Sequence, residues 1–88
     1  MSPSLHTVHV KYFASIREAI GMAQEEVSTA AKTLDALRAE LIARGGAYAE
    51  VLASGRAVRM ALNQSLSDGK ATLTAGAEVA FFPPVTGG

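Results

Sequence analysis

The fold can be read from residues 33–46, TLDALRAELIARGG, which carry the clearest helix signal in the chain. Its apolar side chains recur at i, i+3, i+7 and i+8, which places them in one stripe along a helix: Leu34, Leu37, Leu41 and Ile42. The Thr33 hydroxyl is a suitable N-cap, and Gly45 and Gly46 favour the left-handed conformation that ends helices. This helix therefore has one apolar stripe to bury against a partner layer.

Strand patterns on both sides of the helix supply that layer. We expect strands at residues 5–13, 23–28, 58–62 and 77–82, shorter strand segments at 64–66 and 72–74, and short helical pieces at 14–20 and 47–53. One face of a small sheet is the partner that a single amphipathic helix needs. The order predicts an α+β β-grasp fold: a mixed sheet of four to five strands, one main helix packed across it, and the last strand parallel to the first. We assign residues 1–82 to this domain and 83–88 to a flexible tail.

Composition restricts the classes of function. A chain of 88 residues makes one small domain, and its 49% apolar and 18% charged residues are typical of a soluble globular protein. Eight basic residues balance eight acidic ones, so no basic surface predicts a nucleic-acid partner. No membrane-length apolar run or signal peptide is found, and we expect a cytoplasmic protein. The chain has no cysteine, which excludes disulfides, thiolate metal ligands and a cysteine nucleophile within it.

The tail Pro83-Pro84-Val85-Thr86-Gly87-Gly88 has a distinctive chemistry. Pro83 and Pro84 favour an extended stem, and two glycines without side chains fit a narrow slot. Six residues span about 20 Å at roughly 3.3 Å each, enough to place the Gly88 carboxylate inside another protein. The alternative is a frayed chain end without function.

A second prediction concerns apolar side chains on the sheet face away from the helix. Side chains alternate along a strand, so Phe13 and Phe82 lie on that face if the first and last strands run straight. Leu66 is a candidate third member. Such an exposed cluster is typical of a docking surface. The alternative is that a bulge or a strand end turns one ring inward.

The other polar groups form no catalytic constellation. His6 and His9 are three residues apart in a predicted strand and face opposite sides, so we expect no metal site. Glu25 and Glu26 are adjacent in a strand and point to opposite faces, so they make no acid/base pair. The terminal carboxylate remains the one candidate reactive group.

Three segments carry a more specific pattern: residues 10–18 (VKYFASIRE), 61–66 (ALNQSL) and 77–88 (AEVAFFPPVTGG). They resemble the small subunits of molybdopterin synthase, the sulfur carriers of the MoaD/ThiS family, which have a ubiquitin-like β-grasp fold. The similarity spans the whole domain, although residues 21–59 match only in pattern. The ending FFPPVTGG is the most specific part of the resemblance.

The resemblance implies that the Gly88 carboxylate is the working group. An activating enzyme similar to ubiquitin activators uses ATP and magnesium to adenylate it, and a sulfur donor converts it to a thiocarboxylate. The carrier inserts its tail into the large synthase subunit and donates sulfur to cyclic pyranopterin monophosphate. The family assembly joins two small and two large subunits. The resemblance also places Phe13, Leu66 and Phe82 on the contact surface, and it implies no bound cofactor.

Three other functions remain open from the sequence. The chain is similar to sulfur carriers for the thiazole of thiamine, which share the fold and the Gly-Gly ending. It has the ending of a protein modifier that joins its last glycine to a lysine. It also fits a plain interaction module with an idle tail.

Overall fold

A computed structural model of the protein describes residues 5–53 and 57–84. The elements along the chain are β1 (His6–Tyr12), α1 (Ala14–Ile20), β2 (Gln24–Thr29), α2 (Leu34–Ile42), α3 (Gly46–Leu52), β3 (Arg59–Leu62), β4 (Ser65–Ser67) and β5 (Glu78–Phe82). Of the predicted tail, Pro83 and Pro84 are described, whereas residues 85–88 lie outside the described residues.

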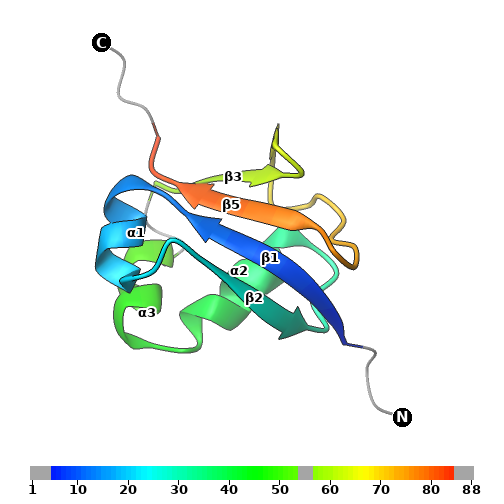
Figure 1. The fold of residues 1–88 in the computed structure, drawn as a ribbon, viewed down its shortest axis with the longest axis horizontal. Coiled ribbons are helices and arrows are strands. Elements are labelled where there is room, and N and C mark those ends of the chain that lie inside the picture. Colours follow the sequence, from blue (N-terminus) through cyan, green and yellow to red (C-terminus); the bar gives the residue numbers. More distant parts are fainter. Residues whose placement is uncertain (1–4, 54–56, 85–88) are drawn as a thin grey trace.

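The five strands form one mixed sheet in the order β2-β1-β5-β3-β4 (Figure 1). β1 pairs antiparallel with β2 and parallel with β5, and β3 lies antiparallel to both β5 and β4. The first and last strands are therefore neighbours at the centre of the sheet and run in the same direction. The predicted β-grasp topology is confirmed.

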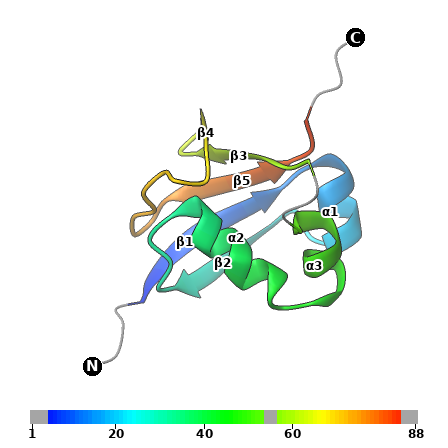
Figure 2. The same cartoon turned by 180° about the vertical axis from the view of Figure 1, so that it is seen from behind.

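Helix α2 crosses one face of the sheet, as Figure 2 shows from the helix side. Its side chains Leu34, Leu37 and Leu41 are fully buried, and Ile42 packs against the core from its edge. The Thr33 hydroxyl accepts a hydrogen bond from the backbone N–H of Ala36 at 3.2 Å, the predicted N-cap. None of the helices within residues 5–53 and 57–84 is long and apolar enough to cross a membrane.

The predicted strand at residues 72–74 is wrong. This segment makes only an isolated bridge between Thr72 and Thr33, and the Leu73 N–H donates to the Lys32 carbonyl at 2.8 Å. Leu73 is buried, so its apolar character reflects core packing beside the start of α2. The segment is a loop held against the two residues that precede α2.

The predicted strand at residues 64–66 begins one residue later, at Ser65. Asn63 and Gln64 both have positive φ, 50° and 71°, and join β3 to β4 as a two-residue turn. Positive φ at both central positions is the signature of a type I′ hairpin turn. Gln64 belongs to this turn and is unavailable to the strand.

Candidate functional site

The site begins with three apolar side chains that the sequence placed away from the helix. Phe13 and Leu66 are 46% and 66% exposed, and Phe82 is partly buried and lies outside the buried core. The residue before each phenylalanine, Tyr12 or Phe81, is fully buried on the helix side. The alternation therefore runs through both strand ends without interruption. The predicted placement of the three side chains is confirmed, whereas their role in binding stays a prediction.

The sheet register brings these three residues onto one surface. The Phe13 N–H donates to the Phe81 carbonyl at 3.1 Å, so Phe13 lies beside the end of β5 that carries Phe82. Leu66 lies opposite Ala61, which in turn lies opposite Ala80. We call these five residues the apolar patch: Phe13, Ala61, Leu66, Ala80 and Phe82. Ala61 and Ala80 are the small members of the patch, and Phe13, Leu66 and Phe82 are the large ones.

Ion pairs border the apolar patch along β1. The Lys11 ammonium lies 3.3 Å from the Glu78 carboxylate. His9, the neighbouring residue of β1 on the same face, has its ring Nδ1 3.6 Å from the Glu26 carboxylate. Both pairs are partly exposed, so each contributes little to stability. The Lys11–Glu78 pair balances one positive with one negative charge beside the patch.

The two histidines and the two adjacent glutamates lie as the strand pattern predicts. His9 and Glu26 are exposed on the open face, whereas His6 and Glu25 are half-buried on the helix side. Within the described part of the chain, no group of three or more His, Asp or Glu side chains could hold a metal ion.

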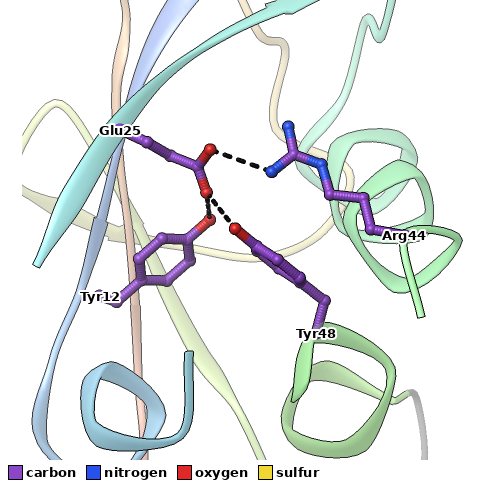
Figure 3. Close-up of polar contacts among 4 residues, drawn as sticks. All are labelled: Tyr12, Glu25, Arg44 and Tyr48. Atoms are coloured by element: carbon purple, nitrogen blue, oxygen red, sulfur yellow. Dashed lines mark hydrogen bonds and ion pairs between the residues drawn. The ribbon is translucent and has the colours of Figure 1, made fainter. Parts of the chain in front are cut away.

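Glu25 has a role that the sequence reasoning missed. Figure 3 shows its carboxylate at the centre of three contacts from other elements. One oxygen accepts hydrogen bonds from the hydroxyls of Tyr12 and Tyr48, both at 2.7 Å, and the other lies 3.0 Å from the Arg44 guanidinium. Arg44 also covers the Tyr48 ring, with its Cζ 5.0 Å from the centroid. The cluster ties α3 and the turn between α2 and α3 to the strands β1 and β2.

These contacts change the ionisation of the cluster. Desolvation opposes the charged form of Glu25, but hydrogen bonds from Tyr48 and Tyr12 and the Arg44 contact outweigh it and hold the pKa of Glu25 below its usual range. Burial, and then the hydrogen bond to Glu25, raise the pKa of Tyr12 and of Tyr48. Glu25 is thus held as a carboxylate and the two phenols as hydroxyls. This arrangement stabilises the fold rather than supplying an acid or a base, because Glu25 has its oxygens occupied.

The chain leaves the domain directly beside the apolar patch. Pro83 and Pro84 follow Phe82, and both are partly buried. Pro83 also lines a hollow of about 490 Å³ between α1 and α3, together with Ile16, Ala19 and Val51. The predicted site residues Val85, Thr86, Gly87 and Gly88 lie outside the described residues. The chain therefore leaves β5 between the apolar patch and this hollow.

Comparison with known proteins gives the family. The model of the ThiS family matches residues 10–88, which covers most of the chain. The chain belongs to the ThiS family. This confirms the resemblance seen in the sequence.

Two relatives of this ThiS-family chain have the same name. It is 42% identical over 81 residues to the molybdopterin synthase sulfur carrier subunit of Escherichia coli, covering 92% of this chain and 99% of that protein. Its identity to the subunit of the same name from Haemophilus influenzae is 37% over the same coverage.

Solved structures of related proteins share the fold. The complex of subunits 1 and 2 of the molybdopterin-converting factor from Helicobacter pylori contains a chain that is 31% identical, with a TM-score of 0.63, covering 93% of this ThiS-family chain and 99% of that one. Small archaeal modifier protein 1 of Haloferax volcanii has a TM-score of 0.76 at 22% identity, covering 91% and 99% of the two chains. The latter similarity concerns the fold alone.

Proposed function

We propose that this chain is the sulfur-carrier subunit of molybdopterin synthase in molybdenum cofactor biosynthesis. The observation that carries the proposal is the identity of 42% to a protein of that name over 99% of its length. The exposed Phe13 and Leu66 beside the exit of a tail ending in Gly87-Gly88 support it, because a carrier needs both a docking surface and a deliverable end. The chain acts in the cytoplasm and contributes no stand-alone catalytic site.

The chemistry takes place at the Gly88 carboxyl group. A terminal carboxyl has a pKa of about 3.5, so it is an anion at neutral pH and a poor electrophile. Attack of this carboxylate on the α-phosphate of ATP releases pyrophosphate and gives an acyl adenylate with a good leaving group. A sulfur donor then displaces AMP and leaves a thiocarboxylate. After that sulfur has bonded to cyclic pyranopterin monophosphate, water attacks the Gly88 carbonyl carbon, the C–S bond breaks and the carboxylate is restored; two such deliveries build the dithiolene.

Two partners follow from this chemistry. The first is an adenylating enzyme similar to ubiquitin activators, which binds the ATP and magnesium, so the carrier itself holds no cofactor or metal. The second is the large subunit of molybdopterin synthase, in a heterotetramer of two small and two large subunits. The solved complex of the Helicobacter pylori subunits supports such a partner. Phe13, Leu66 and Phe82 dock on the large subunit, and Pro83-Pro84-Val85-Thr86-Gly87-Gly88 enters its active site.

Mass spectrometry of the intact protein tests the proposal. After incubation with the activating enzyme, ATP and a sulfur source, the protein should gain the mass difference of one oxygen exchanged for one sulfur. The charged protein should then convert cyclic pyranopterin monophosphate when the large subunit is added. Deleting Gly88 should abolish both results and leave the circular dichroism spectrum unchanged. Conversion that persists without Gly88 contradicts the proposal.

The same experiment separates the other functions. A thiamine thiazole carrier gains the same sulfur but supports thiazole synthesis with its own synthase and leaves the pyranopterin unchanged. A protein modifier gives covalent conjugates that persist on denaturing gels. An interaction module with an idle tail gains no sulfur, and deletion of Gly88 has no effect on it.

A further inference from the structure

Arg59 lies at the edge of the apolar patch where the tail leaves the domain. It opens β3 and pairs with Phe82 across the β3–β5 ladder, so the two side chains lie on the same face of the sheet. The next residue, Met60, is buried on the helix side, as the alternation of a strand requires. Arg59 therefore presents an exposed guanidinium on the open face, next to a side chain of the patch.

Its charge differs from the other charges on this face. Lys11 is paired with Glu78 and His9 with Glu26, whereas Arg59 makes no ion pair with a carboxylate of residues 5–53 and 57–84. Asp68 is the acidic residue just after β4; its Oδ1 accepts a hydrogen bond from the Lys70 N–H at 2.8 Å, and it makes no ion pair with Arg59. Arg59 is therefore a cation at the edge of the apolar patch whose guanidinium has no carboxylate partner among the described residues.

The surface beside Arg59 is also hollowed. A depression of about 450 Å³ is lined by Arg59, Leu66 and Asp68, together with Val58, Met60, Ser67 and Gly69. Leu66 belongs to the apolar patch, so the depression continues the patch toward the β4 edge. A side chain of a docked protein that enters it meets apolar groups and the guanidinium of Arg59.

We propose that Arg59 is a specificity-determining residue of the docking surface and binds a carboxylate side chain of the large synthase subunit. The inference rests on the proposed function, because it takes that subunit as the protein that covers the patch. Docking removes water from Arg59, and a desolvated cation without a partner opposes binding. An acidic group of the partner at that point offsets this cost. Guanidinium also forms two parallel hydrogen bonds to a carboxylate, which fixes the orientation of the docked chain.

Binding of matched variants to the purified large subunit tests the inference by calorimetry. Arg59→Met keeps the length and apolar stem of the side chain and removes its charge, and it should weaken binding about tenfold or more. Arg59→Lys should bind more tightly than Arg59→Met because it keeps a cation. Arg59→Glu should bind most weakly. The control is Lys32→Met, which removes an exposed cation beyond the opposite end of β1 and should bind like the wild type.

The dependence on salt and on the partner's charge completes the test. Wild-type binding should weaken between low and high ionic strength, and Arg59→Met should show a smaller change. A charge-reversal scan of the large subunit, Asp or Glu to Lys one at a time, should find one variant that binds Arg59→Glu more tightly than it binds the wild type. That recovery shows that the substituted carboxylate of the large subunit and Arg59 form an energetically coupled pair.

The outcomes separate the inference from the proposed function. If Phe13→Ala weakens binding while Arg59→Met binds like the wild type, the apolar docking surface stands and the role of Arg59 is wrong. If the wild type does not bind the large subunit at all, the proposed function fails and the inference fails with it.

Discussion

The ring of Tyr12 stacks on the ring of Phe81, with centroids 6.2 Å apart and planes inclined by 17°. Both rings are buried on the helix side of the two central, parallel strands. The next residue in each strand is a phenylalanine on the opposite face, Phe13 after Tyr12 and Phe82 after Phe81. The buried pair, Tyr12 and Phe81, therefore fixes the two strand ends relative to each other. It thereby also fixes the relative position of Phe13 and Phe82. Fold stability and the shape of the apolar patch depend on the same two positions.

Substitutions at neighbouring phenylalanines should separate stability from docking. Phe81→Ala removes a fully buried ring and should lower the free energy of unfolding by about 3–5 kcal/mol. Phe13→Ala removes an exposed ring and should change it by only about 0.5 kcal/mol, while weakening binding to the large subunit roughly tenfold or more. Denaturant melts and calorimetric titration measure the two effects. If Phe13→Ala and Phe82→Ala greatly lower the melting temperature with affinity intact, the apolar patch is part of the core.

The turn between β3 and β4 should be destabilised by substitution of Asn63 but tolerate glycine at Gln64. The Asn63 Oδ1 accepts a hydrogen bond from the Glu78 N–H at 3.0 Å, and the Asn63 N–H donates to the Glu78 carbonyl at 2.8 Å. Asn63→Ala loses the first bond and places alanine at positive φ, so it should destabilise the protein by about 1–2 kcal/mol. Gln64→Gly should be neutral or slightly stabilising, because glycine adopts positive φ without strain. A large destabilisation by Gln64→Gly would show that the Gln64 side chain has a structural role.

Periodicity was sufficient to predict the elements that face a single apolar layer. The stripe of Leu34, Leu37 and Leu41 predicts both α2 and the face that it buries, and the alternation in β1 and β5 predicts that Phe13 is exposed. In a small domain, a long amphipathic helix can bury its apolar stripe in only one way, against the single partner layer. The same reasoning failed at Leu73, where one buried side chain in a loop gives the pattern of a short strand.

The sequence could not reveal the cluster around Glu25. Two adjacent glutamates in a weak edge strand are typical of a solvated face, and Tyr48 and Arg44 lie about twenty residues away in the chain. Only the tertiary fold, which places the Tyr48 ring of α3 against the Tyr12 ring of β1, brings these groups together. A signal was available in the alternation, since Glu25 shares a face with the buried Val27 and a carboxylate there needs partners.

Replacing this carboxylate should destabilise the fold at neutral pH. Glu25→Gln keeps the shape of the side chain and an oxygen that accepts hydrogen bonds from Tyr12 and Tyr48. It removes the negative charge that strengthens those bonds and that pairs with Arg44, so the free energy of unfolding should fall by about 1–2 kcal/mol. The matched control is Glu26→Gln on the exposed face, which should change it by only about 0.5 kcal/mol. Equal effects of the two substitutions in urea melts would exclude a structural role for the cluster.

The same cluster should limit stability at both ends of the pH range. The folded state lowers the pKa of Glu25, so the stability it contributes is complete above the unfolded value of about 4.3 and is lost as the pH falls through the folded pKa. The folded state raises the pKa of Tyr12 and of Tyr48, so their contribution is complete below about pH 10 and is lost as the pH rises above it. Urea melts of the wild type and of Glu25→Gln across this range measure both effects. The difference between the two proteins should be constant near neutral pH and shrink at acid pH, because protonated Glu25 resembles glutamine in charge. If the difference stays constant down to pH values well below the pKa of the unfolded carboxyl, the protonation of Glu25 is not coupled to folding.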